Sequence, residues 1–215
     1  MLQADAGALD IRDGQVVNAD TGEERLPLEE LGRIVYFRGD TLPKGLPREL
    51  VQTRHFITMD YPFAFTNGVQ ASYLEVDIET GVVTLLKHWC VEDCGRVINP
   101  QLVDEQIRGG IVQGLGGALY EEIHYDSGGQ LLNGSMADYL VPMAGEMPDM
   151  QIGHVETPTG ESELGAKGAG EAGTAGAPAA VMNAINDALR PLGAQVTEMP
   201  FTPERILRAL GKLQD

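Results

Sequence analysis

Hydrophobic and polar positions alternate most regularly over residues 68–93, in the stretch GVQASYLEVDIETGVVTLLKHWCVED. The first half divides into two sets of alternate residues. One set is Val69, Ala71, Tyr73, Glu75 and Asp77, and the other is Gln70, Ser72, Leu74, Val76 and Ile78. A period of two is typical of a β-strand, and the polar break at 79–81 predicts a turn. We therefore expect two long antiparallel strands.

Apolar residues recur at helical spacing over residues 26–37, 99–122, 177–191 and 202–213, which predicts a helix in each. Pro27 and Pro178 are expected in the first turns of the first and third helices, Pro191 after the third, and Thr202 as the N-cap of the last. Residues 1–25 predict a hairpin with an Asp-Gly turn, and 39–50 a loop. Two short extended pieces after the DSGG turn and a strand over 150–158 complete the pattern. Such a mixture, without regular β-α-β alternation, is typical of an α+β fold.

The predicted helix over 99–122 has an unusual composition, because five glycines fall between positions 109 and 117. They give up about 4–5 kcal/mol of helix propensity relative to alanine. On a helical wheel Gln106, Gly110, Gln113 and Gly117 share one face, opposite a run of ordinary apolar side chains. The glycines could admit either a neighbouring helix or strand, or a ligand. The two amides tilt the interpretation towards a ligand.

A second glycine-rich stretch, GAKGAGEAGTAGAPAAV at 165–181, contains one carboxylate, Glu171. A phosphate-binding P-loop is excluded because Ala166 stands where the lysine is required, and a dinucleotide fold lacks the buried strand that must precede it. A flexible linker would not lead directly into a well-formed helix. The remaining interpretation is a catalytic base whose pKa rises because glycine and alanine walls solvate it poorly. Lys167 could oppose that rise if it came close.

Composition narrows the classes of partner and compartment. The chain has 32 acidic and 15 basic residues, a formal charge of −17, which argues against binding nucleic acid or an anionic membrane. No signal peptide and no apolar run of roughly 20 residues is visible, so we expect a soluble, cytoplasmic protein. Cys90 and Cys94 are too few for a tetrathiolate cluster and are expected to be reduced thiols. The four histidines lack ligand spacing, so no metal ligand is expected from this chain.

Two stretches carry a family resemblance. VEDCGRVINPQLVDEQIRGGIVQGLGGALYEE and LGAKGAGEAGTAGAPAAVMNAINDAL closely resemble the C-terminal part of the molybdopterin-binding large subunit of the xanthine dehydrogenase and aldehyde oxidase family. Within that family, the two stretches most resemble large chains of the carbon monoxide dehydrogenase type. The resemblance implies that residues 1–215 are a partial molybdopterin-binding domain of long antiparallel strands packed with helices. Residues 1–67 would form an N-terminal hairpin, helix and loop, and 68–215 the core that contacts the cofactor.

The resemblance also implies roles for individual residues. Glu171, in the K-G-x-G-E segment, would be the general base that deprotonates a molybdenum-bound hydroxyl, whose oxygen attacks an electrophilic carbon while a hydride passes to a sulfido ligand. The cofactor would be contacted by Gln106, Asn99, Pro100, Gln101, Lys167, Gly168, Ala169 and Gly170. The pterin dithiolene would hold the metal, which therefore needs no side-chain ligand here.

The implied cofactor is molybdopterin with molybdenum, expected in its cytosine dinucleotide form, with [2Fe–2S] clusters and FAD on partner chains. Family subunits are several times longer, so the rest of the large subunit and the iron–sulfur and flavin subunits are expected partners. The implied function is oxidation of an aldehyde or N-heterocyclic substrate with water as the oxygen source. The alternative is a non-catalytic molybdopterin-binding or assembly module, which would need the glycines but not Glu171. Ala172 departs from the Pro or Ser frequent in the family and leaves the substrate open.

Aromatic residues give a further expectation. Trp89, Tyr61, Phe63 and Phe65 are interpreted as core or interface packing, with a substrate channel as the alternative.

Overall fold

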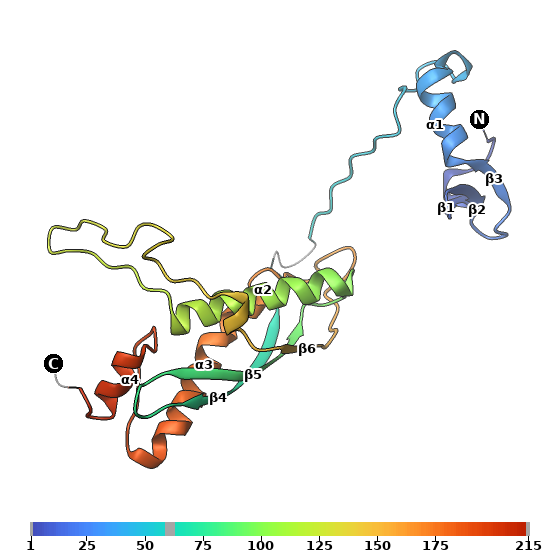
Figure 1. The fold of residues 1–215 in the computed structure, drawn as a ribbon. Coiled ribbons are helices and arrows are strands. Elements are labelled where there is room, and N and C mark those ends of the chain that lie inside the picture. The colour runs from blue at the N-terminus through green and yellow to red at the C-terminus, as the bar shows by residue number, and fades with distance from the viewer. Residues whose placement is uncertain (1, 59–62, 214–215) are drawn as a thin grey trace. The chain divides into compact units, whose positions relative to one another are not determined.

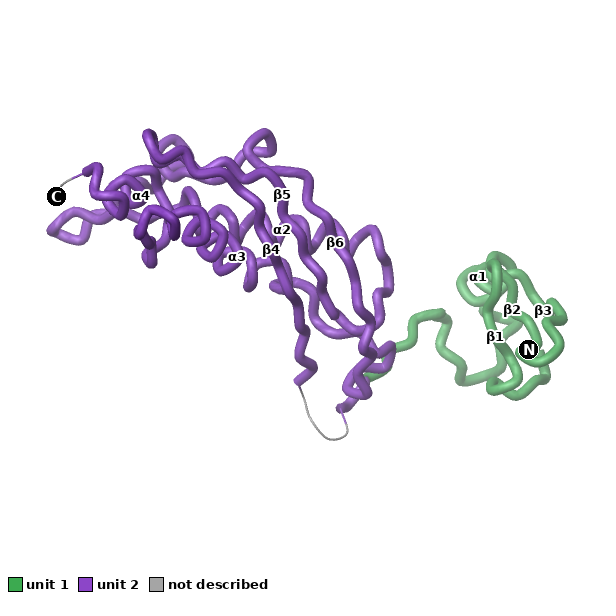
Figure 2. The backbone as a smooth tube through the Cα atoms, turned by 90° about the horizontal axis from the view of Figure 1, so that it is seen from below, with its two compact units in different colours: residues 1–55 green, residues 56–215 purple. Residues whose placement is uncertain are grey.

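The computed structural model describes residues 2–58 and 63–213 of the 215-residue chain. The chain divides into two compact units, Met1–His55 and Phe56–Asp215, which are coloured separately in Figure 2. Tyr61 lies outside the described residues. Phe63 and Phe65 are 62% and 66% exposed, so they do not fill the core of this chain.

The first unit is a small sheet with one helix. β1 (Leu9–Arg12), β2 (Gln15–Asn18) and β3 (Glu24–Pro27) are antiparallel neighbours in that order, and α1 (Leu28–Phe37) follows. The predicted Asp-Gly turn is confirmed, with both Asp13 and Gly14 at positive φ, as a two-residue hairpin turn requires. Pro27 was expected inside the first helical turn. It instead ends β3 and is the N-cap of α1, because β2 pairs with the chain up to this residue.

The second unit contains the predicted pair of long strands (Figure 1). β4 (Asn67–Val76) and β5 (Val83–Asp93) are antiparallel, and β6 (Met150–His154) lies parallel on the other side of β5. The two short extended pieces expected after the DSGG turn do not form strands. Only a single bridge joins Tyr125 to Leu131 within the described part of that segment, and a 3-10 turn at Ala144–Glu146 precedes β6.

A β-bulge decides which side chains of β5 face inward. Tyr73 pairs with Lys87 and Leu74 with Leu85, so the register shifts by one residue at this point. The extra residue changes the parity of the strand, and both Leu85 and His88 are therefore buried although they are three positions apart. On β4 the inward set is the one that contains Gln70, Ser72, Leu74 and Val76.

Two long helices cover the sheet. α3 (Ala172–Leu189) packs against β4 and β5 and also against α2 (Pro100–Leu119), which reaches β6 (Figure 1). The apolar face expected on α2 is confirmed, since Ile107, Ile111 and Leu115 are fully buried in the core. His154, at the end of β6, hydrogen-bonds Asp104 of α2 at 2.5 Å.

The glycines of α2 serve partly to admit a helix. A Cβ on Gly110 would lie 3.2 Å from the Gly173 backbone, and one on Gly114 would lie 2.7 Å from the Thr174 carbonyl oxygen. The neighbouring-helix interpretation is therefore correct for these two positions. Gly109 and Gly117 face open space, and a Cβ on either would meet no described atom within 4 Å.

α3 begins at Ala172, five residues before its predicted start at 177, so Pro178 lies inside the helix instead of in its first turn. Proline removes the bond from its own nitrogen to the Thr174 carbonyl. That carbonyl lies against α2 at Gly114, where the two backbones approach closely. Packing of small residues between the two helices thus extends α3 through a sequence of weak helix propensity.

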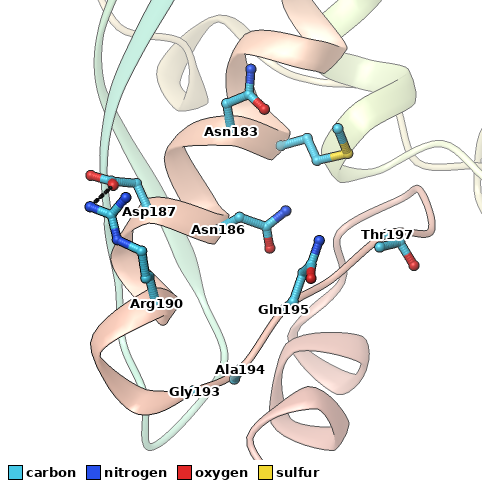
Figure 3. Close-up of a pocket in the computed structure, with 9 residues that line it drawn as sticks. Asn183, Asn186, Asp187, Arg190, Gly193, Ala194, Gln195 and Thr197 are labelled. Atoms are coloured by element: carbon cyan, nitrogen blue, oxygen red, sulfur yellow. Dashed lines mark ion pairs between the residues drawn. The ribbon is translucent and has the colours of Figure 1, made fainter.

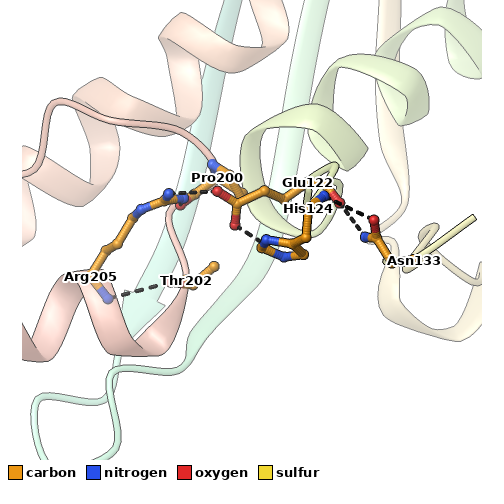
Figure 4. A network of polar contacts seen from close by, with 6 residues as sticks. All are labelled: Glu122, His124, Asn133, Pro200, Thr202 and Arg205. Atoms are coloured by element: carbon orange, nitrogen blue, oxygen red, sulfur yellow. Dashed lines mark hydrogen bonds and ion pairs between the residues drawn. The ribbon is translucent and has the colours of Figure 1, made fainter. Parts of the chain in front are cut away.

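The C-terminal helix α4 (Pro203–Ala209) is tied to the end of α2 by a polar network (Figure 4). Its predicted N-cap is confirmed: the Thr202 hydroxyl accepts a hydrogen bond from the Arg205 amide at 3.3 Å. The Arg205 guanidinium donates to Glu122 at 2.7 Å and to the Pro200 carbonyl at 2.8 Å.

Cys90 and Cys94 are free and buried, as expected. Within the described residues no helix is both long and apolar enough to cross a bilayer.

Candidate functional site

Glu171 stands at the start of α3 with its carboxylate uncommitted. It is the N-cap residue, and its main-chain carbonyl accepts hydrogen bonds from the amides of Thr174 and Ala175, but its side chain makes no capping bond. The carboxylate has no hydrogen-bond or ion-pair partner among the described residues. The sequence predicted a poorly solvated carboxylate. Glu171 is instead exposed, so the residues of this chain alone do not shield it from water.

Two hollows meet at this glutamate. One, of about 540 Å³, is lined by Gln113 and Glu121 of the α2 side and by Glu171, Thr174 and Ala175 of the α3 side. The other, of about 410 Å³, lies between the first turns of α3 and the end of the β4–β5 pair, where Gln70 and Glu92 line it. Glu171 and Ala175 border both, so the free carboxylate can reach a group in either hollow.

The segment before Glu171 is held at one end and open at the other. Residues 165–167 are bound to the β5 end by hydrogen bonds from the Arg96 amide to the Gly165 carbonyl at 3.0 Å and from the Lys167 amide to the Cys94 carbonyl at 2.7 Å. The amides of Gly168, Ala169, Gly170 and Glu171 donate to no acceptor within the described residues. Methyl groups on Gly168 or Gly170 would meet nothing within 4 Å.

Gln106 of α2 lies beside this segment. Its side-chain amide donates to the Gly170 carbonyl at 3.2 Å and so joins α2 to the residue before Glu171. Gln113, about two turns further along the same face, lies within 3.5 Å of the Thr174 hydroxyl. The predicted amide face of α2 therefore borders the candidate base.

Lys167 does not turn towards Glu171. Its ammonium lies 3.3 Å from Asp93 Oδ1, and the same oxygen accepts hydrogen bonds from the amides of Gly95 at 2.9 Å and Thr157 at 3.1 Å. The bonds from Thr157 and Gly95, with Lys167, hold the pKa of Asp93 well below its usual range. Lys167 therefore does not pair with the Glu171 carboxylate. It fixes the segment that carries Glu171 by binding Asp93.

Asn99, Pro100 and Gln101 lie apart from the base. Asn99 is the N-cap of α2, and its side-chain oxygen accepts a hydrogen bond from the Leu102 amide at 3.2 Å. At 1.5 Å per residue the three lie roughly 8–11 Å from Gln106 along the helix axis. All three are exposed. They can contact a cofactor only if it extends along α2 from the Glu171 region.

Several polar residues at the site were not singled out from the sequence. Glu121 accepts a hydrogen bond from the Tyr139 hydroxyl at 2.6 Å, which raises the pKa of Tyr139. Glu92 is 2% exposed and accepts from the Cys90 thiol at 3.1 Å, and its burial raises its pKa. The alternation along β4 could have pointed to Gln70, because it lies on the same face of the strand as the buried Leu74.

Another hollow, of about 530 Å³, lies at the far end of α3 (Figure 3). Its amide Asn186 is already satisfied, because it donates to the Val196 carbonyl and accepts from the Val196 amide, both at 2.9 Å. Asp187 and Arg190 pair with each other. These bonds hold the 193–197 loop against the helix, and we assign the hollow no chemistry.

The site fits a group that approaches bare backbone and presents acceptors to it. A row of uncommitted amides with open glycines can bind heteroatoms or phosphate oxygens, and side chains would obstruct that approach. A pterin cofactor has this chemistry. The residues that would hold it are those of 168–170 and Gln106.

Comparison with known proteins agrees with this chemistry. A family model described as "Molybdopterin cofactor-binding domain" matches residues 1–148. The nicotine 6-hydroxylase large subunit of Paenarthrobacter nicotinovorans is 40% identical over 209 residues, 97% of this chain and 25% of that protein. The chain thus spans about a quarter of the length of the curated relatives it matches.

Solved structures have the same fold. Quinoline 2-oxidoreductase from Pseudomonas putida 86 superimposes with a TM-score of 0.83 and 39% identity, covering 98% of this chain and 27% of that one. The Cu,Mo-CO dehydrogenase gives a TM-score of 0.78 with 28% identity, again over 98% of this chain and 26% of that one. The expected fold is therefore confirmed, and the chain belongs to the molybdopterin cofactor-binding domain family, that of the molybdenum-binding large subunits of xanthine dehydrogenase and related enzymes.

Proposed function

We propose that this chain supplies the general base, Glu171, of a molybdenum hydroxylase. The observation that supports this is a free carboxylate directly after four amides that have no acceptor within the described residues. A module that only held the cofactor would need those amides and the open glycines. It would have no use for an unpaired acid at the point where two hollows meet.

The residues of this chain have separate tasks in the proposal. Molybdopterin, when bound, supplies the two-electron redox chemistry. Glu171 accepts a proton on a carboxylate oxygen, which no described neighbour neutralises. Gln106, through the Gly170 carbonyl, and Lys167, through Asp93, hold the segment so that its amides face the cofactor. Water is the source of the oxygen that enters the product.

We propose an N-heteroaromatic substrate in preference to an aldehyde. The two relatives near 40% identity are named for nicotine and quinoline, both of which contain such a ring. A ring carbon bonded to nitrogen is electron-poor, which suits attack by an oxygen that loses its proton to a base. The hollow of about 540 Å³ beside Gln113 and Glu121 has the size of a small-molecule site.

The proposal includes partners and a cofactor form. One relative is named as the gamma subunit of a dehydrogenase complex, and this chain corresponds to a quarter of its length. We propose that the rest of a large subunit covers the exposed Glu171, and that partner chains carry [2Fe–2S] clusters and FAD. The pterin is proposed in its cytosine dinucleotide form.

The test is Glu171→Gln in the assembled complex purified from its host. Molybdenum content by elemental mass spectrometry should stay near that of the unaltered complex, while kcat for N-heteroaromatic hydroxylation falls about 10²–10⁴-fold. The matched control is Glu163→Gln, which removes an exposed carboxylate eight residues earlier and should change neither quantity.

Two results would refute the proposal. Full turnover in Glu171→Gln would remove the base assignment. A chain that purifies without partners and binds the cofactor without turnover would instead identify a non-catalytic binding module.

A further inference from the structure

A chain of hydrogen-bonded polar side chains, with the buried His88 at its centre, runs from the sheet to the first turn of α3. Ser72 Oγ lies 2.9 Å from His88 Nδ1, and His88 Nε2 lies 3.0 Å from Gln70 Oε1. The Gln70 side-chain nitrogen then donates to the main-chain carbonyl of Gly173 at 2.9 Å and to that of Ala172 at 3.4 Å. These carbonyls follow Glu171 directly in the sequence.

The direction of every hydrogen bond in this chain follows from its last link. Carbonyl oxygens only accept, so the Gln70 nitrogen must face them and its Oε1 must face His88. His88 Nε2 therefore carries the proton and donates it to Oε1. His88 Nδ1 is left as an acceptor, and the Ser72 hydroxyl donates to it. The imidazole is neutral, which agrees with its complete burial.

The local structure is built around this arrangement. Ser72 and His88 are direct cross-strand partners, and the bulge at Tyr73–Leu74 lets His88 share the inward face with Leu85. Gln70 lies across α3 at Gly176, where a Cβ would come within 3.0–3.1 Å of the Gln70 side chain. A glycine at 176 thus leaves room for the amide.

The start of α3 needs such support. Its first residues are mostly glycine and alanine, and no side chain caps them. Among the described residues, hydrogen bonds tie this turn to its surroundings on two sides. On one side the Thr174 hydroxyl donates to the Gly110 carbonyl at 3.0 Å and lies 3.5 Å from Gln113 Oε1, and on the other the Gln70 side chain donates to the Ala172 and Gly173 carbonyls. Gln70 also lines the hollow that Glu171 and Glu92 border.

We propose that Gln70, oriented by His88 and Ser72, is a positioning residue for Glu171. By holding the carbonyls of Ala172 and Gly173, it fixes the first turn of α3 and hence the direction in which the carboxylate of Glu171 leaves the helix. This inference rests on the proposed role of Glu171 as the base. Its effect on catalysis would come through geometry, since a misplacement of about 1 Å can cost a rate factor near 100.

The test is Gln70→Met, which preserves length and volume but removes the hydrogen bonds. Hydrogen exchange of the full chain, followed by mass spectrometry, should become about tenfold faster in peptides covering 172–180, as expected from loss of one net hydrogen bond. Peptides covering β4 and β5 should be unchanged. In the assembled complex, kcat should fall about 10- to 100-fold at unchanged molybdenum content and unchanged KM.

The matched control is Gln151→Met. Gln151 is an exposed glutamine of the same sheet whose side chain accepts from the Trp89 indole at 2.9 Å and makes no hydrogen bond to a described residue of α3 or to Glu171. It should leave exchange in 172–180 and turnover unchanged. If Gln70→Met does not fold, Ser72→Ala, which removes only the distal donor, is judged by the same criteria.

Unchanged exchange in 172–180 would overturn the positioning role, and so would acceleration spread evenly over the sheet, which indicates a merely structural polar cluster. Failure of the proposed function has a different signature. Full turnover in Glu171→Gln would remove the base, whatever the exchange at 172–180 shows.

Discussion

Lys167 and Asp93 form an ion pair 3.3 Å long whose side chains are only 9% and 12% exposed. The carboxylate oxygen that meets the ammonium also accepts the amides of Gly95 and Thr157. One oxygen atom therefore joins the end of β5, the chain after β6 and the segment that leads to Glu171.

This arrangement predicts a graded response to substitution at position 93. Asp93→Asn keeps an oxygen that can accept the two amides but loses the attraction for Lys167, and Asp93→Ala loses all three contacts. The melting temperature should therefore be highest for the unaltered chain, lower for Asp93→Asn and lowest for Asp93→Ala. Molybdenum retention in the complex should follow the same order.

The control is Asp149→Asn, which breaks a 3.6 Å pair between Arg108 and an aspartate that is 89% exposed. Exposed pairs of this kind contribute little to stability, so its melting temperature should not move. An Asp93→Ala chain as stable as the unaltered one would contradict the assignment of Asp93 as the junction.

Two glycines in the same helix are predicted to respond with opposite signs. Gly109 is exposed with no atom within 4 Å of a Cβ position, so Gly109→Ala should raise the free energy of unfolding by about 0.8–1 kcal/mol through helix propensity. At Gly114 a Cβ would lie 2.7 Å from the Thr174 carbonyl oxygen and 2.8 Å from the Ala177 Cβ. Gly114→Ala should lower stability by about 1–3 kcal/mol, because α2 and α3 must separate.

Urea unfolding of the two variants, monitored by circular dichroism, measures both effects. Equal and stabilising shifts would mean that the close approach of α2 and α3 at Gly114 does not constrain the residue there.

Periodicity predicted the elements of this fold well, because it reflects burial of one face. The alternation at 68–93 placed both long strands, and the apolar positions of the 99–122 segment placed Ile107, Ile111 and Leu115 in the core. The start of α3 was misplaced because proline at 178 is a local signal for a first turn, and contact between two glycine-containing helices overrode it.

The site was predictable only as far as its motifs reached. Gln106 and 167–171 were both singled out from their motifs, and the structure brings them together, since the Gln106 amide donates to the Gly170 carbonyl. The partner of Lys167 was not predictable, because Asp93 lies 74 positions earlier and its approach depends on the pairing of Gly95 with Ala166. The Gln70–His88 bond depends on a strand register that includes a bulge, and a single sequence does not specify that register.

The buried His88 predicts a pH dependence of stability. Burial lowers the pKa of His88 from 6.5 to about 4. Between these values the unfolded chain binds a proton that the folded chain does not, so the free energy of unfolding should decrease as the pH falls from 6.5 towards 4. Above pH 6.5 His88 is neutral in both states and contributes no slope. The full shift corresponds to about 3 kcal/mol.

Urea midpoints of the unaltered chain and of His88→Gln, measured from pH 7.5 to 4.5, separate this contribution from others. Glu92 has the opposite effect, because its raised pKa makes the folded state more stable when that carboxyl is protonated. Its contribution is common to both chains and cancels in the difference. If His88→Gln retains the full acid slope, another group is responsible for it.

The two side chains that anchor the first turn of α3 should act together. Thr174→Val removes the bond to the Gly110 carbonyl with little change in volume, and Gln70→Met removes the bonds to the Ala172 and Gly173 carbonyls. Each should lower the free energy of unfolding by about 1 kcal/mol. Because both hold one turn, the double variant should depart from additivity by more than about 0.5 kcal/mol.

The reference cycle combines Gln70→Met with Thr202→Ala, which removes the N-cap of α4 and should be additive within that margin. Additivity in both cycles would mean that Gln70 and Thr174 do not hold a common turn, and that the direction of Glu171 is set by α2 alone.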